Sequence, residues 1–131
     1  VNTYYSEITM KTVLLVDNHE GFRSSIVKYF VVGGMQVVEC SSGQEALKRL
    51  QFGGIDIVLT DLNMPVMTGI ELIEAIRKNE EWNGIPIFIL SVTENEHLIQ
   101  RAMDLGAAGY LQKPFSLDEF LSLAREHVPE L

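Results

Sequence analysis

The sequence has little cysteine, little positive charge and no long apolar run, and each shortage excludes a class of protein. A single cysteine, Cys40, cannot form an internal disulfide or a cysteine-rich zinc site. Ten basic against 18 acidic residues give a formal net charge of −8, which disfavours nonspecific binding to nucleic acid or anionic membranes. No window reaches the ~18 apolar residues of a membrane span, and no secretory leader is visible. We expect a cytoplasmic protein that contacts neither membrane nor nucleic acid directly.

The chain is long enough for one domain with its own apolar core. It has 131 residues, and no repeat, low-complexity tract or linker divides it. The first nine residues, VNTYYSEIT, are polar and lack periodicity. We therefore expect residues 1–9 to be a leader or an added tail, and residues 10–131 to form the folded domain.

Short apolar runs alternate with segments of helical periodicity. The runs predict five strands, over residues 12–16, 35–40, 56–60, 86–92 and 108–112. Three of the runs are nearly continuous in Val, Ile and Leu, which is typical of parallel strands buried on both faces. The segments between and after them predict five helices, the last with an apolar face that reaches Val128. Five such units predict an α/β fold with one doubly wound, five-stranded parallel sheet flanked by helices.

Two S-x-x-E patterns mark expected helix starts. Ser42 with Glu45, and Ser116 with Glu119, each have the spacing of a capping box. Cys40 lies in an apolar run and is expected to be a small buried side chain.

Polar residues stand where four of the predicted strands end. Asp17 and Asn18 follow the first strand, Asp61 the third and Ser91 the fourth, and Lys113 follows the fifth. Because such sheets bind ligands at the carboxyl ends of their strands, we expect these side chains to share one crevice.

The residue types in this crevice suit phosphoryl chemistry. Neighbouring carboxylates repel each other unless a cation neutralises them, and oxygen ligands suit Mg²⁺. A lysine and a hydroxyl beside that ion would receive phosphoryl oxygens, and a carboxylate can itself carry a phosphoryl group. Each residue also has an ordinary explanation: Asp17 and Asp61 could cap helices or turns, and Lys113 could be a solvated cation. Their joint occurrence at the strand ends favours an aspartyl-phosphate site.

Four sequence blocks carry a family resemblance. They are LLVDNHE (14–20), DIVLTDLNMPVMTG (56–69), IFILSVTENE (87–96) and GAAGYLQKPF (106–115). In order and spacing they resemble the signature blocks of the response-regulator receiver domain of two-component signal transduction. The resemblance runs from Met10 to about Val128 and implies the flavodoxin-like receiver fold.

The resemblance also implies a role for each strand-end residue. Asp61 would be the phosphoacceptor and would work with Ser91 and Lys113 as the catalytic set. Asp17, Asp61 and the backbone carbonyl of Asn63 would hold Mg²⁺.

A switch and a set of partners follow from the same resemblance. Ser91 and Tyr110 would form the switch that changes a protein-interaction surface, and Pro114 would follow a cis peptide bond. The phosphoryl donor would be a histidine kinase or phosphotransfer protein, and the signal would pass to a downstream output domain or protein. A phosphorylation-dependent dimer is also compatible with the family. Such a domain catalyses only its own phosphorylation and dephosphorylation and is not a metabolic enzyme.

Asn18 departs from the family pattern. The family usually has a second acid at this position as a direct metal ligand. An amide oxygen coordinates Mg²⁺ without adding charge, so we expect weaker Mg²⁺ binding. Three alternative functions remain open: a phosphate-independent receiver that acts as an interaction module, a flavodoxin-like electron carrier, and a hydrolase with an aspartyl intermediate.

Four other polar residues are expected to have ordinary roles. Thr68 replaces an acid that many relatives carry, and its hydroxyl should cap the third helix. The histidines, His19, His97 and His127, are too scattered in the sequence to suggest a metal triad. We expect His97 and His127 on helices and all three histidines on the surface.

Overall fold

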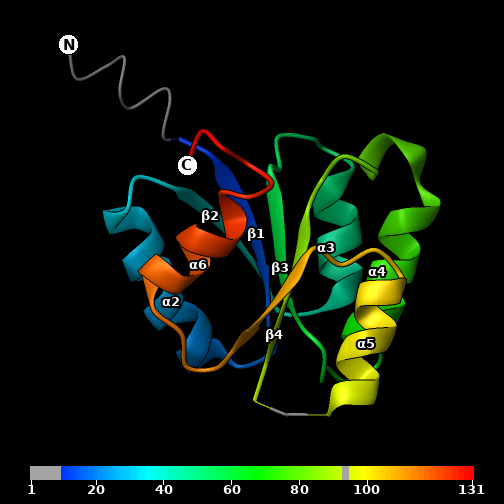
Figure 1. The fold of residues 1–131 in the computed structure, drawn as a ribbon. Coiled ribbons are helices and arrows are strands. Elements are labelled where there is room, and N and C mark those ends of the chain that lie inside the picture. Colours follow the sequence, from blue (N-terminus) through cyan, green and yellow to red (C-terminus); the bar gives the residue numbers. More distant parts are fainter. Residues whose placement is uncertain (1–9, 93–94) are drawn as a thin grey trace.

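Strands and helices alternate along the chain (Figure 1), and the computed structural model describes residues 10–92 and 95–131. The predicted leader or tail at residues 1–9 lies outside this range. The strands are β1 (Thr12–Val16), β2 (Gln36–Cys40), β3 (Ile57–Asp61), β4 (Ile87–Ser91) and β5 (Gly109–Gln112). The helices are α2 (Glu20–Val32), α3 (Gly43–Leu50), α4 (Gly69–Lys78), α5 (Glu96–Asp104) and α6 (Leu117–Ala124), with a short 3₁₀ helix η1 (Glu80–Trp82) after α4.

The five strands form one parallel sheet in the order β2-β1-β3-β4-β5. At its centre, Leu14 of β1 lies between Val38 of β2 and Val58 of β3. Helices α2 and α6 cover one face, and α3, α4 and α5 cover the other (Figure 1). The predicted doubly wound α/β sheet with five helices is therefore confirmed. The strand order reverses between β1 and β3, the place where such sheets open a binding crevice.

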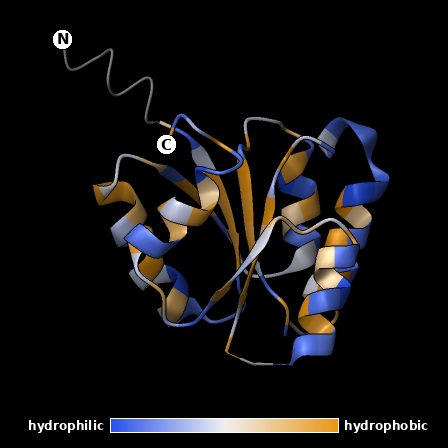
Figure 2. Ribbon diagram, in the orientation of Figure 1, coloured by the Kyte–Doolittle hydropathy of each residue, from blue (hydrophilic) through white to orange (hydrophobic). Residues whose placement is uncertain are grey.

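Each face of the sheet has its own apolar core. Side chains alternate along β1, so Val13 and Leu15 pack under α2 and α6, whereas Leu14 and Val16 pack under α3, α4 and α5. Strands β1, β3 and β4 are buried at every position, which explains their continuous apolar sequences. Figure 2 shows the apolar strands between helices that carry both polar and apolar residues. Among the described residues, no helix has the length and apolar character needed to cross a membrane.

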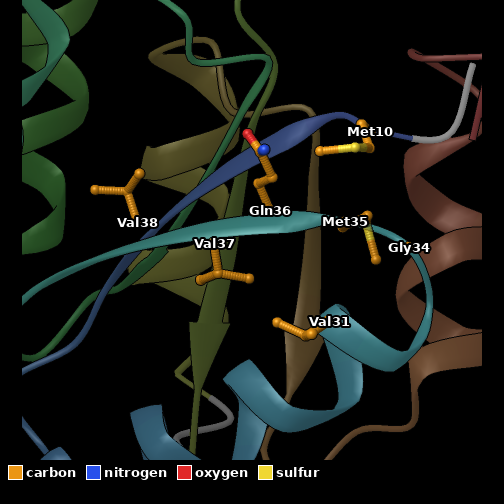
Figure 3. Close-up of a pocket in the computed structure, with 7 residues that line it drawn as sticks. All are labelled: Met10, Val31, Gly34, Met35, Gln36, Val37 and Val38. Atoms are coloured by element: carbon orange, nitrogen blue, oxygen red, sulfur yellow. The ribbon is translucent and has the colours of Figure 1, made fainter. Parts of the chain in front are cut away.

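Strand β2 forms one edge of the sheet and differs from the central strands. Its residues are mostly half-buried or exposed, apart from Cys40, which is buried as predicted. An apolar depression lies beside this edge (Figure 3), lined by Met10, Val31, Gly34, Met35, Gln36, Val37 and Val38. The exposed Gln36 and Glu39 interrupt the apolar pattern of β2, as is common at edges that must not pair with other chains.

Two helix starts have complete capping boxes. At α6, the Ser116 hydroxyl accepts the backbone N–H of Glu119, whose carboxylate accepts the N–H of Ser116, as predicted. At α4, Thr68 and Glu71 make the same pair of bonds, which confirms Thr68 as a cap.

The predicted capping box of α3 is wrong in one half. The Ser42 hydroxyl accepts the N–H of Glu45, but the Glu45 carboxylate does not return to Ser42. It accepts instead from the hydroxyl of Ser41 at 2.7 Å and from its backbone N–H at 3.1 Å. The preceding serine offers two donors, and this competition decides the partner.

The last helix is shorter than its apolar pattern suggested. Helix α6 ends at Ala124, and a turn follows in which the Val128 N–H donates to the Ala124 carbonyl at 2.8 Å. Val128 still reaches the core, so periodicity alone overstated the helix. His127 consequently lies outside the helix, contrary to the prediction.

Arg77 joins several loops at the end of the sheet that lies opposite the carboxyl ends of the strands. Its guanidinium donates to the backbone carbonyls of Trp82, Asn83, Ile85 and Gly106. Burial lowers the pKa of Arg77 from its usual value. The carbonyl groups that it binds lie just before β4 and β5, so Arg77 fixes where both strands begin.

Candidate functional site

Four of the five polar residues predicted at strand ends lie together at the carboxyl ends of the strands. Asp17 directly follows β1, Asp61 ends β3, Ser91 ends β4 and Lys113 directly follows β5. Asp17, Asp61 and Ser91 are buried, with exposed fractions of 0%, 4% and 0%. Lys113 also donates its backbone N–H to the Ser91 carbonyl at 2.9 Å, which ties the ends of β4 and β5 together.

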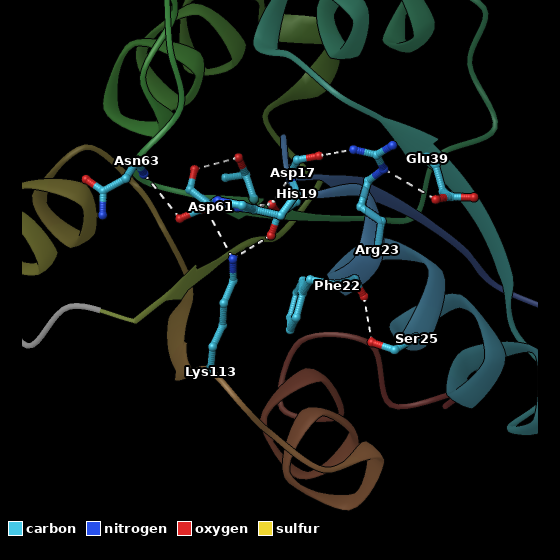
Figure 4. Close-up of polar contacts among 10 residues, drawn as sticks. Asp17, His19, Phe22, Arg23, Ser25, Glu39, Asp61, Asn63 and Lys113 are labelled. Atoms are coloured by element: carbon cyan, nitrogen blue, oxygen red, sulfur yellow. Dashed lines mark hydrogen bonds and ion pairs between the residues drawn. The ribbon is translucent and has the colours of Figure 1, made fainter.

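The ammonium group of Lys113 bridges the two aspartates (Figure 4). Its Nζ atom lies 2.5 Å from Oδ2 of Asp17 and 3.1 Å from Oδ2 of Asp61. The same atom lies 4.3 Å from the ring centroid of Phe22, which flanks the lysine chain. The lysine side chain is only 9% exposed. Because buried carboxylates need a counter-charge, Lys113 is the group that makes this pair of acids tolerable in the fold.

The second oxygen of each aspartate is bound by the loop that follows it. Oδ1 of Asp17 accepts the backbone N–H of His19 at 2.8 Å, and Oδ1 of Asp61 accepts that of Asn63 at 3.1 Å. Neither aspartate caps a helix, since the side chain of Thr68 caps α4 and the N-cap of α2 is His19. Each carboxylate is therefore oriented by its own chain and by Lys113.

A tight turn and a close backbone contact position Asp61. Val66 has a φ of 68°, and the Met67 N–H donates to the Pro65 carbonyl at 2.8 Å across it. The chain thereby returns so sharply that a Cβ atom on Gly69 would overlap the Asp61 carbonyl oxygen. The first residue of α4 must therefore be glycine for the helix to pack directly on the backbone of Asp61.

Three residues near Asp17 belong to the site although their sequence pattern did not predict it. The Arg23 guanidinium donates to the Asp17 carbonyl at 2.5 Å and to Oε1 of Glu39 at 3.3 Å (Figure 4), which anchors the end of β1 to α2 and β2. Phe22 flanks Lys113, and Nδ1 of His19 lies 3.1 Å from Oδ1 of Asp17. Their position in the six residues after a strand-end aspartate is the signal that could have indicated them.

All three histidines are exposed, as predicted, but their surroundings differ. Ligand atoms of Asp17, His19 and Asp61 all lie within 4.8 Å of one another, so His19 belongs to the site. The ring of His127 lies 5.6 Å from that of Phe88.

The remaining predicted residues surround this core of the site. Asn63 is exposed and, with Asp61, His19, Phe22 and others, lines an open pocket. Asn18 is exposed at the end of β1. Tyr110 is half-buried on β5, packs against the core under α3, α4 and α5, and lies beside Ile89 of β4.

Comparison with known proteins decides the family. The response regulator receiver domain family matches residues 13–125. The chain belongs to this family. The receiver also has the cis peptide bond between Lys113 and Pro114 that the resemblance implied.

Relatives of this receiver include transcriptional regulators and chemotaxis proteins. It is 33% identical over 119 residues to the transcriptional regulatory protein KdpE of Mycobacterium tuberculosis, covering 91% of this chain and 51% of KdpE. It is 34% identical over 106 residues to chemotaxis protein CheY of Pseudomonas aeruginosa, covering 79% of this chain and 85% of CheY. The solved structure of CheY4 of Vibrio cholerae superposes with a TM-score of 0.83 at 32% identity, covering 89% and 98% of the two chains. The receiver thus spans about half the length of KdpE.

The donor set of the site fits a divalent cation. Asp17 and Asp61 are buried acids whose oxygens lie close together, and a single ammonium group leaves one of their two negative charges uncompensated. Carboxylate oxygens are the ligands that Mg²⁺ prefers. Asp17 and Asp61 could therefore bind a metal ion.

Proposed function

We propose that this receiver is a phosphoacceptor signalling domain and that Asp61 takes a phosphoryl group from a histidine kinase or phosphotransfer protein. One observation carries the proposal: Lys113 holds the buried carboxylates of Asp17 and Asp61 together at the switch point of the sheet, beside an open pocket. Membership of the receiver family supports it.

Each residue of the site has a part in the transfer. A carboxylate oxygen of Asp61 attacks the phosphorus atom, an O–P bond forms, and the P–N bond to the donor histidine breaks. Lys113 balances negative charge on the phosphoryl oxygens, and the Ser91 hydroxyl donates a hydrogen bond to one of them. Asp17, Asp61 and the backbone carbonyl of Asn63 are the groups that we assign to Mg²⁺. When bound, Mg²⁺ would supply further positive charge to the phosphoryl oxygens.

The switch that we propose starts from Ser91 and ends at Tyr110. Once Ser91 turns toward the phosphoryl group, Tyr110 follows it into the core under α3, α4 and α5. Tyr110 is already half-buried against that core. The surface formed by α5, β5 and α6 then changes, and a phosphorylation event becomes a binding event for an output domain or protein.

Asn18 favours a second candidate function, a phosphate-independent receiver that serves as an interaction module. It removes one negative charge from the metal site and lies exposed beside Asp17. Weaker cation binding would reduce phosphorylation without disturbing the fold.

The deciding experiment is intact-mass spectrometry after incubation with acetyl phosphate, with and without Mg²⁺. Wild type, Asp61→Asn and Asp118→Asn are compared, because Asp118 is an exposed aspartate on α6 and serves as the matched control. We expect one Mg²⁺-dependent phosphoryl adduct in wild type and Asp118→Asn, and none in Asp61→Asn. A folded wild type without adduct at high Mg²⁺ would reject phosphoacceptor activity and favour the interaction module.

A further inference from the structure

His19 places an imidazole next to the two carboxylates of the site. Its Nδ1 atom lies 3.1 Å from Oδ1 of Asp17, and ligand atoms from His19, Asp17 and Asp61 fall within 4.8 Å of one another. Asp17 and His19 lie in the loop between β1 and α2, and Asp61 ends the adjacent strand β3. Two carboxylates and one histidine in such a cluster form a recognisable set of metal ligands.

The local backbone keeps this imidazole at the site. The backbone N–H of His19 donates to Oδ1 of Asp17 at 2.8 Å, so the residue is held where α2 begins. Its side chain is 64% exposed and lines the pocket beside Asp61. The ring can therefore turn toward a cation without disturbing the core, and Figure 4 shows His19 beside the two acids, on the same side of them as the ammonium end of Lys113.

Because Asn18 is neutral, a nitrogen ligand would contribute a larger share of cation binding at this site. Asp17 and Asp61 are the only carboxylates in the cluster among the described residues, and the residue between Asp17 and His19 is a neutral amide. With two acids and one bridging ammonium, the site has little charge with which to strip water from Mg²⁺. An imidazole adds a strong donor without adding charge.

We propose that His19 is a direct nitrogen ligand of the cation site and biases this receiver toward a borderline divalent cation such as Mn²⁺. The proposal rests on the proposed function, because it concerns the same cation. Mg²⁺ is a hard ion that prefers oxygen ligands, whereas imidazole binds transition metals well. Loss of His19 therefore weakens Mn²⁺ binding much more than Mg²⁺ binding.

The test is isothermal titration calorimetry with MnCl₂ and with MgCl₂, at mildly alkaline pH where imidazole is neutral. Wild type, His19→Ala and His97→Ala are compared, and His97 is an exposed histidine on α5 that serves as the control. We expect His19→Ala to weaken Mn²⁺ binding by about tenfold or more and Mg²⁺ binding far less, with His97→Ala unchanged. Most sites bind Mn²⁺ more tightly than Mg²⁺, so the change in the ratio of the two affinities decides.

A spectroscopic measurement makes the ligand visible. Electron spin echo modulation of the Mn²⁺-loaded protein should show a coordinated ¹⁴N nucleus in wild type and His97→Ala, and none in His19→Ala. Equal losses for both cations, or no ¹⁴N modulation in wild type, would overturn the assignment. Formation of the Asp61 adduct is measured separately. An adduct without ¹⁴N modulation rejects the ligand alone, whereas ¹⁴N modulation without an adduct rejects the phosphoacceptor function alone.

Discussion

Gly69 offers the sharpest test of how the fold positions Asp61. In Gly69→Ala the new Cβ atom would lie 2.7 Å from Cα of Leu62 and closer still to the Asp61 carbonyl oxygen. Ordinary contacts begin at 3.4 Å, so the Leu62 contact alone requires α4 or the end of β3 to retreat by about 0.7 Å, and the Asp61 contact requires more. Both neighbours are backbone atoms, and neither can rotate away.

The expected cost follows from this overlap. Overpacking of a rigid site typically lowers the free energy of unfolding by about 1–3 kcal/mol. Alanine is a better helix former than glycine by up to about 1 kcal/mol, which offsets part of the loss. We expect a net loss of about 1–2 kcal/mol, measured by urea denaturation with far-UV circular dichroism.

Two other glycines serve as matched controls. Gly43 also directly follows a hydroxyl cap, but its Cβ would meet the flexible side chain of Met67, with 2.5 Å to Sδ. Gly21 lies in the first turn of α2 with nothing within 4 Å. Gly43→Ala should cost less than Gly69→Ala, and Gly21→Ala should stabilise by about 0.5–1 kcal/mol. If Gly69→Ala unfolds no more easily than Gly43→Ala, the close packing of α4 on Asp61 is refuted.

Three further predictions concern buried or half-buried side chains. Lys113→Met leaves Asp17 and Asp61 buried without a counter-charge and should lower the free energy of unfolding by about 3–5 kcal/mol. Added Mn²⁺ or Mg²⁺ should recover part of this loss in urea titrations. Arg77→Lys cannot reproduce the planar fork that reaches four carbonyls and should cost about 2 kcal/mol, whereas an unchanged urea midpoint would contradict that network. Burial, with Glu45 as a smaller cause, raises the pKa of Cys40 from 9.0 to about 11. Its thiolate is therefore scarce at neutral pH, and an aromatic disulfide reagent should modify it no faster than the protein unfolds.

The strands could be predicted closely because a strand that is buried on both faces has a nearly continuous apolar sequence. Each predicted strand agrees with the structure to within one residue at either end. The placement of Asp17, Asp61, Ser91 and Lys113 followed from that assignment, since the carboxyl ends of parallel strands lie on the same side of the sheet.

Contacts that depend on side-chain competition or on distant loops could not be predicted. The carboxylate of Glu45 accepts hydrogen bonds from Ser41 and not from Ser42, and the spacing in the sequence hardly distinguishes these two partners. Arg77 donates to the carbonyl of Gly106, 29 residues further along the chain, and no local sequence pattern predicts such a bond. Nothing in the sequence distinguishes His19 from an ordinary surface histidine. It belongs to the site because the Asp17 carboxylate is oriented toward its ring.

The ammonium group of Lys113 makes the stability of the buried acid pair depend on the last strand of the sheet. It lies 96 residues after Asp17 and 52 after Asp61, so a growing chain contains both acids long before their counter-charge. A fragment that stops before the end of β5 would bury two negative charges at the centre of its sheet and should fold poorly. Lys113 thus stabilises the two buried acids only after the last strand has joined the sheet. Truncated copies of this domain should therefore remain unfolded and should not form the site.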